Sequence, residues 1–172
     1  MMAGYTSADA FAAQTDEFTW LLQPTTLIDR LYPPLAGTEF HCPIHGAEGI
    51  SKAPFGPYRI DPISHPYKIQ CTVGGEWYPS NEYHKGDMTS GEFADDGNGF
   101  VYNDKHYYPM REYAHMVYGS VVIPSLRSFS QAYLLTGNKE YAHKGCVLLA
   151  RLASEYPNYK DRIDRTYLKG GK

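Results

Sequence analysis

The sequence is short of cysteine and has no long apolar run, and each shortage excludes a class of protein. Three cysteines in 172 residues are too few, and odd in number, for a framework of disulfide bonds. No apolar run reaches the roughly 18 residues that a membrane-spanning helix requires, so we expect no membrane span. The first ten residues lack the basic and apolar stretches of an export signal.

Motifs of several common enzyme classes are also missing. We find no phosphate-binding glycine loop, no strand–turn–helix serine motif and no HExxH zinc motif. The net charge is only −3, which argues against a general nucleic-acid-binding protein. Residues 139–172 hold eight Lys and Arg against four Asp and Glu, so +4 there offsets −7 in residues 1–138. This basic end either favours an anionic partner or is an ordinary solvated surface.

Tyrosine is the residue that the sequence has in abundance, with 16 copies. Its flat ring and polar tip suit wet clefts and the faces of sugars, although mixed use in core and surface explains the same count. A hydrophobic content of 42% fits a globular protein, and we treat residues 1–172 as a single domain.

The N-terminal part of the chain has the pattern of a helical start over residues 7–31. Ser7 is a plausible N-cap, and apolar residues follow at helical spacing through residues 7–22 until Pro24. A further helical turn is expected at residues 26–31.

Residues 33–110 have a different composition, rich in glycine and proline, with apolar residues scattered singly. A connection of this length is uncommon in a compact domain unless it carries function or is held in place by other means. We predict two short strands at 67–72 and 76–79, paired as a hairpin.

Helical periodicity returns over residues 111–157, where we predict a helical hairpin. Pro124 removes a backbone donor, so the first helix should kink near 119–120 or restart with Pro124 in its first turn. Gly137 supplies the left-handed turn before a second helix over 139–156. The remaining residues, 158–172, are polar and are expected to be an exposed tail.

The second helix of this hairpin has a distinct apolar face and a polar one. The expected buried face holds Tyr141, Gly145, Leu148, Leu149, Leu152 and Tyr156, and the opposite face holds Glu140, Lys144, Arg151 and Glu155. We also expect Cys146 to be a small core residue. One hairpin cannot cover its own apolar faces, so we expect the chain to be part of a larger set of hairpins.

Two cysteine motifs in the insert have the spacing of zinc knuckles. Cys42 and His45 form a Cys-x-x-His pair, and Cys71 begins a second knuckle in which Gly74 stands where a ligand belongs. The candidates for the fourth ligand are His41, His65 and His84. A bound metal would explain how this segment holds its shape without a core, and a metal-free hairpin is the alternative.

Two runs in the insert carry a resemblance to a known family. Residues 65–83 read HPYKIQCTVGGEWYPSNEY, and residues 86–100 read GDMTSGEFADDGNGF. Together with the Thr-Gly-Asn turn at 136–138, they resemble the heparinase II/III-like polysaccharide lyases over roughly residues 40–157.

The resemblance implies a mainly α fold: a partial (α/α) toroid of helical hairpins, with a long Gly/Pro-rich insert that contains a small β-hairpin. It implies a secreted or periplasmic enzyme that cleaves uronic-acid-containing polysaccharide by β-elimination. The charge and hydropathy described above predict no nucleic-acid or membrane partner. This chain covers only the opening part of such an enzyme. We therefore expect it to form part of the substrate cleft, with the catalytic residues outside it and little activity of its own.

β-Elimination needs a base, an acid and a group that neutralises the uronate, and Tyr and His suit the first two roles. Weak candidates are Tyr113, His115 and Tyr118, since the last two share a face of the predicted helix. A buried helix with structural hydrogen bonds explains the same residues.

Candidate substrate-binding residues lie in the insert and just before the first helix of the hairpin. They are Trp77, Tyr78, Asn81, His106, Tyr107 and Tyr108. Anchoring of the β-hairpin by Trp77, and a packed loop at 106–108, are the alternatives. The Asp-Asp-Gly-Asn-Gly run at 95–99 superficially suggests calcium, but its spacing favours an Asx-type turn.

Two other functions are compatible with these features. One is a non-catalytic carbohydrate-binding helical module, and the other is a helical-repeat scaffold for protein partners. The long Tyr-rich insert counts against the scaffold, because simple scaffolds keep short connections.

Overall fold

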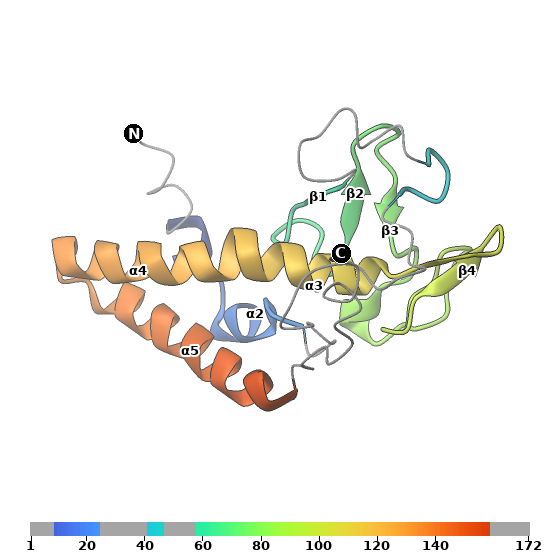
Figure 1. The fold of residues 1–172 in the computed structure, drawn as a ribbon. Coiled ribbons are helices and arrows are strands. Elements are labelled where there is room, and N and C mark those ends of the chain that lie inside the picture. Colours follow the sequence, from blue (N-terminus) through green and yellow to red (C-terminus); the bar gives the residue numbers. More distant parts are fainter. Residues whose placement is uncertain (1–8, 25–40, 47–57, 159–172) are drawn as a thin grey trace, which may run out of the picture.

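The computed structural model describes residues 9–24, 41–46 and 58–158, and every structural statement here concerns those residues (Figure 1). The helical turn predicted at 26–31 and most of the predicted tail lie outside them. None of the described helices is both long and apolar enough to cross a bilayer.

A three-stranded antiparallel sheet forms the centre of the insert. Strand β1 (Tyr58–Ile60) pairs with β2 (Ile69–Cys71), which pairs with β3 (Trp77–Tyr78). Ile69 faces Tyr78 across the second pair, and both side chains are buried. The predicted hairpin of β2 and β3 is therefore confirmed, whereas β1 was not predicted.

A second hairpin joins β4 (Phe100–Tyr102) to β5 (Lys105–Tyr107). Its two turn residues, Asn103 and Asp104, have φ of 49° and 58°. Positive φ at both central positions is the geometry of a two-residue turn whose twist matches that of the strands. This second hairpin is not among the strands predicted from the sequence.

The loop between the two sheets is organised by the buried carboxylate of Asp95. Asp95 Oδ1 accepts hydrogen bonds from the backbone N–H groups of Gly97 (2.7 Å) and Gly99 (2.8 Å). Its Oδ2 accepts from the N–H of Met110 in the first turn of the next helix (2.9 Å). The Asx-type turn is confirmed, and the carboxylate also caps that helix.

One long rod follows, made of α3 (Pro109–Val117), a π-helical turn (Tyr118–Val122) and α4 (Ile123–Thr136) (Figure 1). In the π turn the N–H of Ile123 bonds to the carbonyl of Tyr118, one residue further back than in an α-helix. The irregularity predicted near 119–120 is thus a π turn, after which Pro124 sits in the first turn of α4.

The second helix of the hairpin, α5 (Lys139–Glu155), returns antiparallel to α4, as predicted. Gly137 has φ of 69°, and its N–H bonds to the carbonyl of Tyr133 at 2.8 Å. Asn138 caps α5 by accepting a hydrogen bond from the N–H of Glu140. A short 3-10 turn (Tyr156–Asn158) ends the described chain.

The single helix predicted over 7–22 is divided in two. A helical turn covers residues 9–12, and α2 (Asp16–Leu21) follows after a break. Thr15 is the N-cap of α2, since its hydroxyl accepts from the N–H of Phe18 at 3.1 Å.

The packing of α2 against α5 corrects the face predicted for α5 (Figure 1). Lys144 and Arg151 are buried, whereas Leu149 is exposed, and Cys146 is exposed as well. Lys144 Nζ donates to the Gln14 carbonyl (2.6 Å), and Arg151 Nε donates to the Gln23 carbonyl (3.1 Å). Two cations are thus buried because they satisfy backbone carbonyls of the N-terminal segment.

The expected partial (α/α) toroid is wrong. The described residues contain one helical hairpin, α4–α5, and two small antiparallel sheets, with no succession of hairpins. The physical reason is that α2 occupies a face of α5 on which another hairpin would have to stack, and residues 58–107 form strands and turns.

The core lies where the first sheet meets α3 and the π turn. Its buried members include Cys42, Ile69, Cys71, Tyr78, Tyr113, Val117, Val122 and Leu148. Two of the three cysteines are therefore core residues, and they lie on the sheet side.

Candidate metal centre

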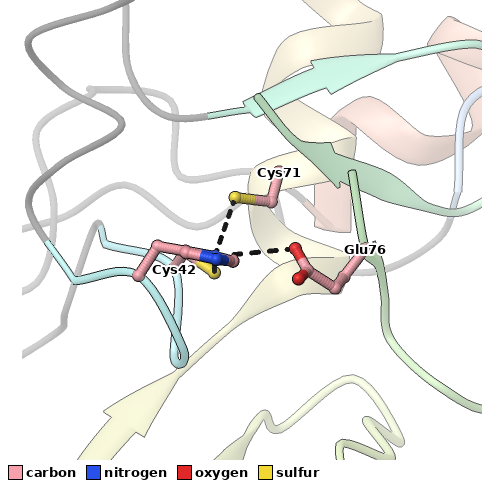
Figure 2. Close-up of side chains that lie close together, drawn as sticks. Cys42, Cys71 and Glu76 are labelled. Carbon is pink, nitrogen blue, oxygen red and sulfur yellow. Dashed lines mark hydrogen bonds and ion pairs between the residues drawn. The ribbon is translucent and has the colours of Figure 1, made fainter. Parts of the chain in front are cut away.

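Four side chains with metal-binding atoms meet beside the three-stranded sheet: Cys42, His45, Cys71 and Glu76. Their ligand atoms all lie within 4.8 Å of one another. Figure 2 shows Cys42, Cys71 and Glu76 converging from separate segments of the chain. Cys42 and His45 come from the turn at 41–46, Cys71 ends β2, and Glu76 directly precedes β3.

Tight backbone turns present the two cysteines. The N–H of Gly46 bonds to the Cys42 carbonyl at 2.8 Å, and the N–H of Gly75 bonds to the Cys71 carbonyl at 3.0 Å. Gly46 and Gly75 have φ of 53° and 85°, which side chains disfavour. A glycine four residues after each cysteine therefore allows the tight turn that brings the chain back toward the sulfur atom.

The distances around His45 Nδ1 are those of a small tetrahedral site. Nδ1 lies 3.5 Å from Cys42 Sγ, 3.6 Å from Cys71 Sγ and 3.6 Å from Glu76 Oε2. Zinc bonds of about 2.3 Å to sulfur and 2.0 Å to nitrogen, at the tetrahedral angle, place the donor atoms about 3.5 Å apart. The four side chains need little movement to hold one ion.

Glu76 completes the set, and the sequence analysis missed it. The predicted alternatives lie elsewhere: His65 stacks on Trp77 with ring centroids 3.9 Å apart, His84 lies 3.5 Å from Glu82, and His41 is not in the cluster. The available signal in the sequence was the carboxylate residue Glu76, two positions after Gly74, where the second ligand of the Cys71 knuckle was expected.

Gly74 was predicted to be the defect of the second knuckle, but the structure gives it a different role. A Cβ at Gly74 would overlap the Glu76 carboxylate and the imidazole of His45. The absent side chain therefore makes room for two of the four ligands.

Hydrogen bonds favour the thiolate form of one cysteine. Burial acts to raise the pKa of Cys42, but hydrogen bonds from the Tyr78 hydroxyl and from His45 outweigh it, and the pKa falls below its ordinary value. Burial raises the pKa of Cys71, and the neighbouring Cys42 adds to that rise. The two sulfurs therefore differ, since the pKa of Cys42 is lowered and the pKa of Cys71 is raised.

The cluster also contains an unsatisfied atom that a cation would satisfy. Glu76 Oε2 is buried and has no hydrogen-bond partner within the described residues, although His45 Nδ1 is at ion-pair distance. Buried carboxylate oxygens are normally bonded. Two sulfurs, one imidazole nitrogen and this oxygen are a chemically suitable donor set, so the four residues can hold a metal ion.

The predicted catalytic candidates are not among these four residues. Tyr113 is 1% exposed, its ring stacks on Tyr67 at 5.5 Å, and burial raises its pKa. His115 is half-buried on α3, and Tyr118 begins the π turn. Tyr113 therefore presents almost no surface to solvent.

The predicted substrate contacts divide into buried and accessible residues. Tyr78, Asn81 and Tyr107 are at most 5% exposed, and Asn81 bonds to the backbone of Asp95, so these three belong to the interior. Trp77 is half-buried, with His65 covering one face of its indole.

Of the remaining pair, His106 and Tyr108 stack at 4.3 Å, and the Tyr108 hydroxyl lies 3.1 Å from Nδ1 of His106. Both side chains are half-buried. The two rings pack against each other, and part of each side chain remains exposed to solvent.

Comparison with known proteins adds no relative. No protein-family model matches the chain. No curated protein matches it, and neither does any solved structure. The heparinase II/III-like resemblance therefore remains an expectation from sequence.

Proposed function

We propose that Cys42, His45, Cys71 and Glu76 bind one zinc ion, which joins the turn at 41–46 to the hairpin of β2 and β3. The observation that carries this proposal is the convergence of the four donors at the separations of a tetrahedral site.

The donor set favours zinc over the hard cations. Thiolate sulfur is a poor ligand for calcium and magnesium, which take oxygen ligands, whereas two sulfurs, a nitrogen and an oxygen suit tetrahedral zinc. Four protein ligands leave no open position for a substrate, so the ion would be structural.

Neighbouring groups support this assignment by orienting the ligands. The Tyr78 hydroxyl lies 3.4 Å from Cys42 Sγ, and the N–H of Val73 donates to Cys71 Sγ at 3.4 Å. Such outer contacts fix ligand geometry and stabilise charge on sulfur. Because Tyr78 is in the core, the ion would be tied directly to the sheet.

Elemental analysis of protein purified without added metal tests the proposal. We expect about one zinc per chain, with Cys42→Ser and Cys71→Ser losing it. Cys146→Ser is the matched control, because Cys146 is the exposed cysteine outside the cluster. Metal-free protein with native circular dichroism and an unchanged melting temperature would contradict the proposal.

We also propose, from the family resemblance, that the chain is part of a lyase acting on uronic-acid-containing polysaccharide and that it contributes binding surface. A non-catalytic carbohydrate-binding protein is the alternative. Support for binding over catalysis comes from the burial of Tyr113 and from the partly exposed Trp77 beside a cationic hollow.

The test is to mix the chain with alginate and heparan sulfate and to follow both affinity and the absorbance of unsaturated products. We expect binding without turnover. Turnover by this chain alone would contradict the assignment to binding surface, and absence of any binding would contradict a carbohydrate role.

A further inference from the structure

A hollow of about 320 Å³ lies on the insert, and none of the four candidate metal ligands lines it. Its lining comes from the turn before β2, the start of β3 and the 3-10 turn Tyr83–Lys85. The lining residues are Ser64, His65, Pro66, Lys68, Trp77, Glu82, His84 and Lys85. Four of these eight side chains are basic or can become so, against one carboxylate.

That carboxylate, Glu82, is the centre of the charge arrangement. Its Oε1 lies 2.7 Å from Lys68 Nζ, and its Oε2 lies 3.5 Å from His84 Nδ1 and 3.9 Å from Lys85 Nζ. The hydrogen bond from Lys68 holds the pKa of Glu82 below its ordinary value, so Glu82 is ionised. Glu82 already occupies the position of a bound anion.

The cations exceed what Glu82 can neutralise. Lys68 and Lys85 carry two positive charges against the one negative charge of Glu82. An ammonium has three donors, and Glu82 accepts one from Lys68. The Lys68 side chain is only 13% exposed, which places its remaining donors where water is limited and a second acceptor gains more.

One wall of the hollow is flat and aromatic. The rings of His65 and Trp77 stack with centroids 3.9 Å apart and planes 9° apart. Nδ1 of His65 is buried and has no hydrogen-bond partner within the described part of the chain. A polar atom without a partner, an excess of cations and a preformed wall together are typical of a ligand site.

We propose that this hollow binds an oxyanion group, a carboxylate or a sulfate, which Lys68 and Lys85 hold beside Trp77. The ligand group would share the cations with Glu82. This inference deepens the polysaccharide proposal by naming where an acidic sugar residue would be held, and it does not depend on the metal.

Two ligands distinguish binding of the anionic group alone from binding of the sugar ring that carries it. Sodium sulfate and a defined oligo-uronate are titrated into the full chain by calorimetry, with a neutral oligosaccharide of equal length as the control. We expect the uronate to bind, sulfate to compete with it, and the neutral sugar not to bind.

Three variants make the test specific to the hollow. Lys68→Met should weaken uronate binding about tenfold or more, the scale of a lost charge-assisted hydrogen bond, and Lys68→Arg should restore most of it. Glu82→Gln should tighten binding several-fold, because it removes the internal competitor. Lys139→Met, which changes an exposed lysine on α5, is the control and should change nothing.

The outcomes distinguish this inference from the function on which it builds. Sulfate binding that Lys68→Met abolishes, with no gain from a uronate ring, supports the hollow and removes the polysaccharide role. If Lys68→Met and Glu82→Gln each fold and each bind the uronate as the native chain does, the proposed binding in the hollow is overturned and the polysaccharide role still stands. Absence of binding by both ligands overturns the inference.

Discussion

The insert and the helical hairpin are stabilised in different ways. Residues 41–46 and 58–107 contain short strands whose turns are held by polar atoms, namely those of the candidate metal ligands, Asp95 and Asn81. The hairpin of α4 and α5 is built from long helices with buried apolar residues such as Phe129 and Leu148. An irregular segment depends on a few strong contacts, whereas a helix spreads its stability over many weak ones.

Metal removal should produce the largest difference between the two regions. With zinc at the proposed site, a strong chelator should decrease the free energy of unfolding of the insert by about 5 kcal/mol, because structural zinc contributes directly to folding. Hydrogen exchange should show lost protection in β1–β3 and retained protection in α4 and α5. Uniform loss across both regions would mean that the regions are not separable.

The buried ion pair on α5 tests whether the helical region also depends on single polar contacts. Arg151 Nη1 lies 2.7 Å from Glu155 Oε1, and both side chains are under 10% exposed. Arg151→Met should cost about 3–5 kcal/mol in urea unfolding, because Glu155 is left as a buried unpaired charge. The double variant with Glu155→Met should recover most of that loss. Equal loss in single and double variants would assign the effect to packing and to the lost hydrogen bond with the Gln23 carbonyl.

Asp95 supplies the corresponding test in the insert. Asp95→Ala leaves the N–H groups of Gly97, Gly99 and Met110 without their acceptor and should cost about 3 kcal/mol in chemical denaturation. Asp96→Ala is the control, because the Asp96 carboxylate accepts a hydrogen bond from only one backbone N–H, that of Asn98, in the exposed part of the same turn. We expect a loss below about 1 kcal/mol there.

The smallest expected effect depends on pH and lies where the two regions meet. Glu112 on α3 lines a narrow hollow with Tyr58, Tyr107 and Tyr108, and desolvation raises its pKa from 4.5 to about 7. A raised pKa means that its contribution to stability is full below pH 4.5 and is lost as pH rises through 7.

Glu112→Gln should therefore be more stable than the native chain at pH 8, by on the order of 2 kcal/mol, and equal to it at pH 4. Thermal unfolding at both pH values measures the difference. The same shift at both pH values would show that ionisation of Glu112 is not the cause.

Local signals predicted the elements that depend on local rules. The Gly137 cap, the start of α5 and the pairing of β2 with β3 follow from turn residues and periodicity, and all three are confirmed. The sequence predicted an irregularity near 119–120, and the structure shows that it is a π turn. The position of Pro124 alone does not indicate which backbone geometry compensates for its missing N–H donor.

The burial of Lys144 and Arg151 could not be read from periodicity. A polar face is normally solvated, and only the arrival of residues 14–23, which flank and include α2 and lie more than 100 residues earlier in the chain, supplies the carbonyls of Gln14 and Gln23 for those cations to bond. The same contact with α2 is what contradicts the expected toroid.

Local spacing predicted the helical hairpin, the β2–β3 hairpin and three of the four candidate ligands, because each depends on residues within a short stretch. Only the packing of distant segments brings Glu76 to the other three candidate ligands, leaves room for it beside Gly74, and places Lys68 and Lys85 in one hollow with Trp77. The reason is physical: local spacing governs backbone conformation, whereas a site is formed by side chains that meet only after distant segments have packed.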